Sequence, residues 1–465
     1  MRPFFGLIRL GAAFLSVLLL CSGCTIRTDA ELQALIDEAQ AAAAASTAVL
    51  ERPDEVSYVP QEKAEPGLAC TASFSPDSDT GADGHLARLL YARLFMPADD
   101  GRPVPAVCER YVWEGTDFIM TLREASFADG SGLTGEDVVY SLARHGFDAV
   151  VREDGCVAVH LETRDGGLPA KLTAVALLKV GTGDEQFPLC SGEYAISADA
   201  QSVYAVAEPG RVRRLVYCES RDELLLAART GQVEYFELDS AGGEAIGGTD
   251  GYTVETVSTR RFHFLYFNAW NRGFTPVEAR LSVSAHLDRE AMAGGGLVPA
   301  YTYVPEDCYL YSDEVAEQSK AALEGADKQV WRYVRLIVNA ENAARIARCQ
   351  VIAEQLAVIG LRVEVEVLPW EEYLKALSDW DFDLAYAEIE LPESYELPQL
   401  FLSEGELNHE TYKSMEADGL MQAFIEADTP DRPAAFARLN ARLTADCPIA
   451  PLFFEEVTAY RYTAP

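Results

Sequence analysis

Two glutamates at the end of one predicted strand are well placed in this sequence to bind a charged solute. The segment DFDLAYAEIEL, residues 381–391, reads as a strand, so its side chains alternate between two faces. Tyr386, Glu388 and Glu390 share one face, with both carboxylates near the carboxyl end. Carboxylates facing inward there would hold an amine or a guanidinium, such as the amino terminus of a peptide. The alternative is an edge strand whose glutamates are solvated.

Aromatic and amide side chains on neighbouring segments are further candidates for solute contact. Trp370 and Tyr373 follow the end of a predicted strand, where their rings could stack on a solute. Residues 261–270 alternate as a strand and place Tyr266 and Asn268 on one face. Packing in the core is the alternative for these aromatic residues, and a structural turn is the alternative for Asn268.

No catalytic motif accompanies these residues, so the sequence does not predict an enzyme. It contains no G-x-S-x-G, H-E-x-x-H or G-x-x-x-x-G-K-[ST] pattern, and His409-Glu410 lacks a second histidine. The three glycines at 294–296 read as a flexible loop. Six histidines and scattered cysteines show no metal-ligand spacing, so we expect neither a metal nor a cofactor.

Length and charge limit the kind of protein this is. The chain has 465 residues, of which 49% are hydrophobic, and strand and helix patterns interleave, which predicts an α/β protein with two domains. Its formal net charge of −36 excludes nucleic acid as a partner. Against that background, Arg260 and Arg261 could pair with a ligand carboxylate or with the acidic surface of the protein itself.

The amino terminus is typical of a secretory signal of the lipoprotein kind. Arg2 and Arg9 precede an apolar stretch, residues 10–20, that is too short to span a bilayer. Small residues come before Cys24. This segment resembles the bacterial lipobox. We therefore expect residues 1–23 to be a signal peptide and residues 24–66 to be a tether. A lipid on Cys24 would anchor the protein to the cell membrane on its extracytoplasmic side, and cleavage with release is the alternative.

Eight cysteines remain once Cys21 and Cys24 are set aside. They are too widely spaced for a C-x-x-C motif. An even number outside the cytoplasm permits disulfides, and free buried thiols are the alternative.

Six segments, in order along the chain, resemble the bacterial extracellular solute-binding proteins of family 5, the peptide/nickel type that feeds ABC importers. The first contains a Phe127-Ala128-Asp129-Gly130 turn and a Thr134–Asp137 capping box that starts a helix. The fourth carries Asn268 and Arg280 in the family pattern. The segments are residues 89–144, 190–197, 228–236, 264–292, 352–388 and 447–454.

The resemblance implies a two-lobed fold like that of periplasmic binding proteins (type II, large peptide-binding cluster). The first lobe would be discontinuous, comprising residues 67–258 and 446–465, and the second would comprise residues 259–445. Two strands would cross between the lobes, near residues 257–264 and 442–450. The solute would lie between the lobes and be enclosed by hinge closure.

Peptide-binding relatives usually carry a tryptophan and then an acidic residue that holds the amino group of the ligand. This chain has Ile389 near the tryptophan position and Pro392 near the acidic one. Glu390 or Glu393 would then be the substitute amine anchor.

The resemblance therefore implies the solute-binding lipoprotein of an ABC importer, a monomer that performs no chemistry. It would deliver a short peptide, or another amine-bearing or cationic molecule, to permease and ATPase subunits. Three alternatives stay open: a lipoprotein of the same fold that senses a ligand for a signalling partner, a binder of a nickel or haem complex, and an extracellular hydrolase on an unrelated fold.

Overall fold

The computed structural model describes residues 65–239, 251–270, 273–327, 332–408 and 412–463. The predicted signal peptide, Cys24 and the tether up to residue 64 lie outside the described residues. Residues from Glu65 onward form one compact unit. Within the described ranges, no helix is both long enough and apolar enough to cross a membrane.

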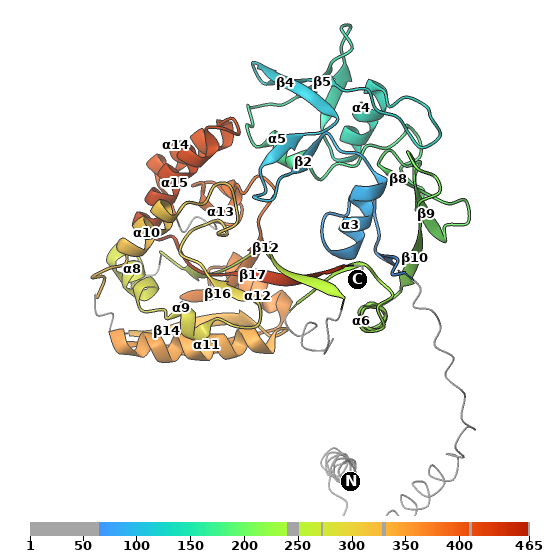
Figure 1. The fold of residues 1–465 in the computed structure, drawn as a ribbon. Coiled ribbons are helices and arrows are strands. Elements are labelled where there is room, and N and C mark those ends of the chain that lie inside the picture. Colours follow the sequence, from blue (N-terminus) through green and yellow to red (C-terminus); the bar gives the residue numbers. More distant parts are fainter. Residues whose placement is uncertain (1–64, 240–250, 271–272, 328–331, 409–411, 464–465) are drawn as a thin grey trace, which may run out of the picture. The chain divides into compact units, whose positions relative to one another are not determined.

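Residues 65–239 form what we call the N-terminal lobe, coloured blue to green in Figure 1. It contains two four-stranded sheets, ordered β1-β10-β9-β8 and β4-β5-β7-β6, and a two-stranded ribbon, β2-β3. The strands are β1 Leu68–Thr71, β2 Phe95–Pro97, β3 Pro103–Pro105, β4 Cys108–Glu114, β5 Asp117–Leu122, β6 Asp148–Val151, β7 Val157–His160, β8 Tyr194–Ile196, β9 Ser202–Ala205, β10 Val212–Cys218 and β11 Tyr235–Leu238. The helices are α3 Gly81–Leu90, α4 Gly135–Arg144, α5 Leu168–Lys171 and α6 Arg221–Arg229.

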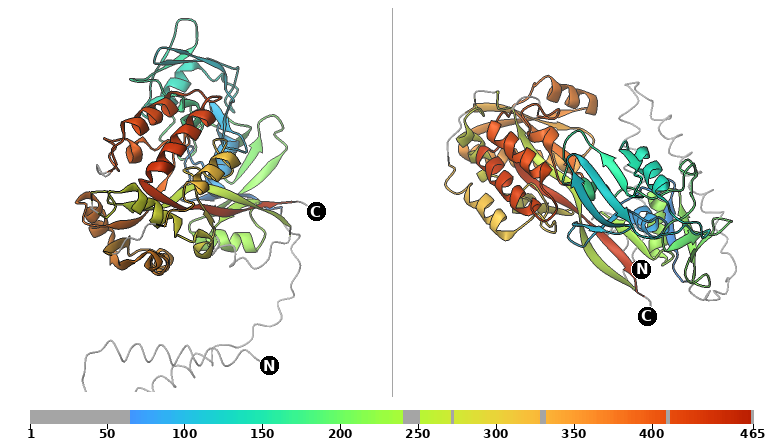
Figure 2. Two further views of the ribbon diagram at one scale, coloured as in Figure 1. Left: turned by 90° about the vertical axis from the view of Figure 1, so that its left-hand side faces the viewer. Right: turned by 90° about the horizontal axis from the view of Figure 1, so that it is seen from above.

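Residues 268–446 form what we call the C-terminal lobe, a sheet covered by helices on both faces (Figures 1 and 2). Its strands are β13 Leu297–Pro299, β14 Arg332–Asn339, β15 Leu361–Leu368 and β16 Leu384–Glu390. Its helices are α8 Val277–Ala285, α9 Arg289–Met292, α10 Asp313–Ala321, α11 Ala343–Leu356, α12 Trp370–Ser378, α13 Pro398–Phe401, α14 Met415–Glu426 and α15 Arg432–Asp446, with a 3₁₀ turn at Ala357–Ile359.

Two long strands, β12 (Tyr252–Phe267) and β17 (Ile449–Tyr462), pair antiparallel and run through both lobes. At one end β17 pairs with β11, and at the other end β12 pairs with β16, so one sheet has the order β11-β17-β12-β16-β14-β15. The register between the two strands shifts between Ser258 and Phe262, next to the predicted lobe boundary at residue 258. The second crossing was predicted too early, because residues 442–446 form the last turn of α15.

The alternation predicted for residues 261–270 is confirmed as far as Phe267, where β12 ends. Phe262, Phe264 and Tyr266 lie in a core with residues of α14 and α15. Leu265 and Phe267 lie in a second core with residues of α8 and α11. Because both faces of this part of the sheet are covered, every side chain of β12 from Phe262 to Phe267 is buried.

Short sequence signals correctly predicted two helix ends and missed a third. Thr134 and Asp137 form the predicted capping box at the start of α4. Gly360 is the stop that the sequence predicts for the helix with Ile346, Ile352 and Ile359 on one face. It has a φ of 87° and ends the turn after α11, where a left-handed residue is needed. In the sequence, the capping-box pattern Thr275-Pro276-Val277-Glu278 predicts one helix that continues to Met292. That prediction is wrong, because α8 ends at Ala285 and Asp288 caps a separate helix, α9.

Candidate functional site

The carboxyl ends of three neighbouring strands lie along one edge of the C-terminal lobe's sheet. β14 is parallel to both β15 and β16, so Asn339, Trp370 and Glu390 follow or end strands at the same edge. In open α/β sheets, ligands bind in the crevice outside this edge. The predicted glutamates therefore lie where a solute site is expected.

Glu388 is held by cations of the protein itself. Its carboxylate pairs with Arg345, and it lies 3.8 Å from Arg261 Nη1 and 3.7 Å from His263 Nδ1. Arg345 is buried and also donates a 2.5 Å hydrogen bond to Asn339 Oδ1. Glu388 therefore neutralises a buried guanidinium, and a solute amine would have to compete with it.

Glu390 and Glu393 pair with a different arginine, Arg260. This pairing lies where Asp79 of the N-terminal lobe comes next to the end of β16, a region that we call the seam between the lobes. Arg260 Nη2 lies 3.1 Å from Glu393 Oε1, 3.5 Å from Glu390 Oε1 and 2.9 Å from Asp79 Oδ2. We call these four residues the Arg260 cluster. Although burial opposes the charge on Arg260, these carboxylates raise its pKa. The cluster therefore joins Asp79 of the N-terminal lobe to both glutamates of the C-terminal lobe.

A small cavity of about 90 Å³ lies beside this cluster. Arg93 on its wall is 2% exposed, and burial lowers its pKa to about 10. Three of its hydrogen bonds go to main-chain carbonyls, and its Nε has no partner among the described residues. The volume suits a few waters or a small functional group rather than a whole peptide. The lining residues are Asp79, Arg88, Arg93, Pro97, Gly101, Thr173, Ala174, Arg260, Glu393 and Tyr395.

Four of the eight predicted ligand contacts are buried, and their polar groups bond to the protein. Asn268 donates to the carbonyls of Trp380 (3.0 Å) and Phe382 (2.9 Å), which holds a turn. The Tyr266 hydroxyl donates to the carbonyl of Asn408, and the Tyr373 hydroxyl donates to that of Tyr386 at 2.9 Å. Tyr386 is fully buried, with its hydroxyl 3.3 Å from His263 Nδ1.

The other four predicted contacts keep some access to solvent. Trp370 is 49% exposed, and its ring stacks on that of Tyr373 with centroids 5.8 Å apart. Glu388 and Glu393 are partly exposed, and the side chain of Glu390 is 61% exposed. An accessible aromatic ring and three accessible carboxylates therefore lie near the carboxyl ends of β15 and β16.

His263 makes stability depend on pH. Burial and then three nearby arginines lower its pKa to about 3, below the value near 6.5 of the unfolded chain. The unfolded state therefore binds the proton more readily, so this stability is complete above pH 6.5 and is lost as the pH falls toward 3. Between pH 7 and pH 5 we expect wild type to lose about 2 kcal/mol more than His263→Gln does, measured by urea unfolding. Equal losses in the two proteins would contradict this assignment.

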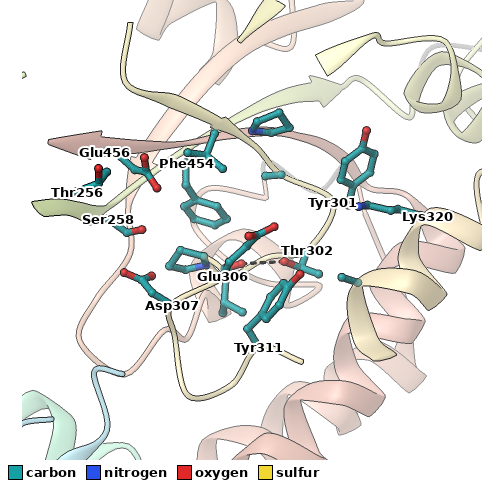
Figure 3. A pocket seen from close by; sticks show the side chains of 16 residues that line it. Thr256, Ser258, Tyr301, Thr302, Glu306, Asp307, Tyr311, Lys320, Phe454 and Glu456 are labelled. Atoms are coloured by element: carbon teal, nitrogen blue, oxygen red, sulfur yellow. Dashed lines mark hydrogen bonds between the residues drawn. The ribbon is translucent and has the colours of Figure 1, made fainter. Parts of the chain in front are cut away.

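A larger cavity of about 350 Å³ lies between the long strands and α10 (Figure 3). Tyr311 and Phe454 supply aromatic wall, and Glu306, Asp307 and Glu456 supply carboxylates. Burial, and then the charges of Asp307 and Glu306, raise the pKa of Glu456. Sequence reasoning did not find this cavity, because its walls come from four separate segments.

The two lobes also touch away from β12 and β17, through residues that sequence reasoning missed. Arg164 donates two 2.7 Å hydrogen bonds to Asp428, and Gly166 N donates to Ile425 O at 2.7 Å. Lys171 Nζ lies 3.1 Å from the carboxylate of Glu396. No sequence motif marks these contacts, which join positions more than 200 residues apart.

Neither a metal site nor a disulfide is found in the part of the chain that the structure describes. No group of three or more His, Cys, Asp or Glu side chains could hold a metal ion there. The eight described cysteines are free thiols, and seven of them are buried. Burial raises the pKa of several of these thiols to about 12, so they pack as apolar groups.

Comparison with known proteins agrees with this architecture. Residues 207–400 match the sequence profile described as "Bacterial extracellular solute-binding proteins, family 5 Middle". A curated relative, the oligopeptide-binding protein AppA of Bacillus subtilis (strain 168), is 22% identical over 275 residues, which are 50% of this chain and 50% of AppA. The alignment therefore spans about half the length of that relative. The predicted resemblance to family 5 is confirmed.

Solved structures match over more of the chain. HbpA2 from Haemophilus parasuis is 15% identical, with a TM-score of 0.72 over 86% of this chain and 96% of HbpA2. Bacillus subtilis AppA, solved in complex with a nonapeptide, is 18% identical, with a TM-score of 0.55 over 86% of this chain and 95% of AppA. At this level of identity the likeness establishes the fold, and the predicted two-lobed α/β architecture is confirmed.

Proposed function

We propose that this chain, with its two-lobed fold and its match to the family 5 solute-binding proteins, is the solute-binding component of an ABC importer. It captures a small solute between its lobes and delivers it to permease and ATPase subunits, without chemistry of its own. The observation that carries this function is the seam, where polar side chains of both lobes meet beside two strands that connect them. Hinge motion about such strands would open and close the seam.

The solute we propose is a short peptide, or another molecule with an amine or a guanidinium. Asp79, Glu390 and Glu393 converge on one point of the seam, and a cationic group suits three carboxylates. Trp370, exposed at the same edge of the sheet, offers a surface for an apolar part of the solute. The curated relative AppA is named as an oligopeptide-binding protein, which agrees with this class.

Attachment to the membrane is part of the proposed function. A lipid on Cys24 would hold the protein on the extracytoplasmic side of the cell membrane, and the tether would let the lobes reach the permease. The strongly acidic body makes a covalent anchor more suitable than electrostatic attachment to anionic lipids.

Native mass spectrometry of soluble protein that starts after Cys24, purified from cells, tests the function. We expect extra masses bound to the folded protein that disappear on denaturation, and their values would identify the solute class. A protein that stays free of bound solute, and that binds none of a panel of short peptides and amines added at millimolar concentration, would contradict the proposal.

Changing both Glu390 and Glu393 to glutamine tests the amine class. Affinity for a tripeptide with a free amino terminus, such as trialanine, should fall by at least about ten-fold, roughly 1.4 kcal/mol. Titration calorimetry with trialanine and with N-acetyl-trialanine would measure this, and the acetylated peptide should show little change. Glu388 is unsuitable for this test, because its loss would leave Arg345 buried without its carboxylate. An unchanged affinity for trialanine would place the amine elsewhere.

A further inference from the structure

The seam between the lobes already holds a cation, and that cation belongs to the protein. One nitrogen of Arg260, Nη2, lies within 3.5 Å of carboxylate oxygens of Asp79, Glu390 and Glu393. Among the described residues, Arg260 is the one cation within 4 Å of any of these three carboxylates. A solute cation that binds there would meet Arg260 first.

The neighbouring arginines do not share this role. Arg88 Nη1 donates to the main-chain carbonyl of Asp79 at 2.7 Å, and Arg93 is held by main-chain carbonyls in the same way. Their positive charges lie on the wall of the same cavity. The carboxylates of the Arg260 cluster nevertheless have Arg260 as their direct partner.

We propose that Arg260 is a resident cation, which fills an ammonium or guanidinium subsite between the lobes and gives it up when the cationic group of a solute binds. This inference rests on the function proposed above and adds a specificity-determining residue to it. The wild-type protein then binds cationic solutes more weakly than its carboxylates alone would allow. A solute must supply contacts elsewhere to offset the displacement of Arg260.

The position of Arg260 suits such an exchange. Arg260 Nε donates to Leu391 O at 2.9 Å, and Leu391 N donates back to Arg260 O at 2.8 Å. The main-chain bond keeps the residue attached to the end of β16. The bond from Nε belongs to the guanidinium, so it is given up when the side chain leaves the carboxylates. The side chain is 22% exposed and that of Glu390 is 61% exposed, so a solute can approach the carboxylates from the solvent.

Arg345 at Glu388 shows the contrasting arrangement. Its side chain is 9% exposed, and it is fixed by Asn339 as well as by Glu388. Removing such a guanidinium from its partners would leave a buried charge uncompensated, which costs several kcal/mol. Exchange with a solute is therefore expected at Arg260 and not at Arg345.

The first experiment uses no peptide and tests whether the subsite exists. Arg260→Ala leaves space beside the three carboxylates, and about 20 mM methylguanidinium should raise its melting temperature by about 2 °C or more. N-methylurea, which is neutral, should not do so. Wild type should not respond, because its own guanidinium fills the subsite. Arg152→Ala is the matched control, since Arg152 pairs with Glu114 at 2.9 Å on the surface.

The second experiment asks whether the subsite affects solute binding. Arg260→Met, which keeps much of the side-chain volume without the charge, should bind trialanine at least about ten-fold more tightly than wild type. Binding of N-acetyl-trialanine should stay the same. This variant also carries the test if Arg260→Ala does not fold.

The outcomes separate the two proposals. Stabilisation of Arg260→Ala by methylguanidinium, with no peptide bound by any variant, would support the resident cation and count against the peptide class. The opposite result has two parts: wild type binds trialanine while Arg260→Met binds it equally or more weakly, and Arg260→Ala does not respond to methylguanidinium. That result would overturn the resident cation and leave the solute-binding function standing.

Discussion

Replacing Glu396 with glutamine is expected to lower the free energy of unfolding by about 3–5 kcal/mol, because it leaves a fully buried arginine without its counter-charge. Arg432 is 1% exposed and Glu396 is 3% exposed. Arg432 Nη1 lies 2.8 Å from Glu396 Oε1, an ion pair that is not aligned as a hydrogen bond. Because both side chains are buried, water cannot solvate the arginine if the glutamate charge is removed.

The surroundings of this pair make the loss larger. Lys171 Nζ lies 3.1 Å from the same carboxylate, so glutamine would remove a negative charge that two cations share, although Lys171 keeps Asp165 as a partner at 2.6 Å. The remaining partners of Arg432 are neutral: it donates to Ser394 O at 2.6 Å and to the Tyr309 hydroxyl at 3.1 Å. Neutral acceptors do not compensate a buried charge as a carboxylate does.

Chemical unfolding of both proteins at pH 7 measures this difference. Glu416→Gln is the matched control, since Glu416 is 66% exposed and pairs with Arg442 at 2.8 Å on the surface, and it should change stability by less than about 1 kcal/mol. A loss in Glu396→Gln no larger than that of the control would contradict the account of a buried, compensated pair.

Sequence patterns predicted those parts of the fold that depend on local periodicity. The two faces of residues 261–267, the capping box at Thr134 and the end of the helix at Gly360 each depend on a few neighbouring residues. The placement of Glu388 and Tyr386 on the same face of β16 follows from the same alternation. Where one helix was predicted from residue 275 to 292, the chain turns at His286 and a second helix begins after Asp288, whose value as an N-cap signal the prediction did not use.

The partners of the predicted site residues could not be predicted in this way. Glu388 was expected to face a solute, but the arginine that neutralises it comes from α11, 43 residues earlier in the chain. Tyr386 is buried because helices cover both faces of the sheet, so alternation does not separate core from crevice there. Tyr373 is buried on the face of α12 that meets this sheet, where its hydroxyl bonds to the carbonyl of Tyr386. Asp79 lies in a loop before α3 with no motif around it, and tertiary contact alone brings it to Arg260.

The contact between the lobes beyond β12 and β17 depends on a glycine. Gly166 lies against the end of α14, and an added Cβ atom would come within 1.9 Å of Ala427 O and 2.4 Å of Ala427 C. No side chain fits at that distance from main-chain atoms, so the segment would have to withdraw. The hydrogen bond from Gly166 N to Ile425 O and the paired bonds from Arg164 to Asp428 would be lost with it.

Gly166→Ala should therefore destabilise the contact between the lobes by about 1–3 kcal/mol and populate a more open form in the absence of solute. Small-angle scattering should show a larger radius of gyration, and thermal unfolding should begin at a lower temperature. Gly419→Ala, in the middle of α14 with no atom within 4 Å of the added Cβ, is the control and should be neutral or more stable by about 0.5–1 kcal/mol.

A compact Gly166→Ala protein with wild-type stability would mean that this contact does not hold the lobes together. An open form that compacts again on binding trialanine would link the same contact to solute capture, because a ligand shifts such an equilibrium through its preference for one state.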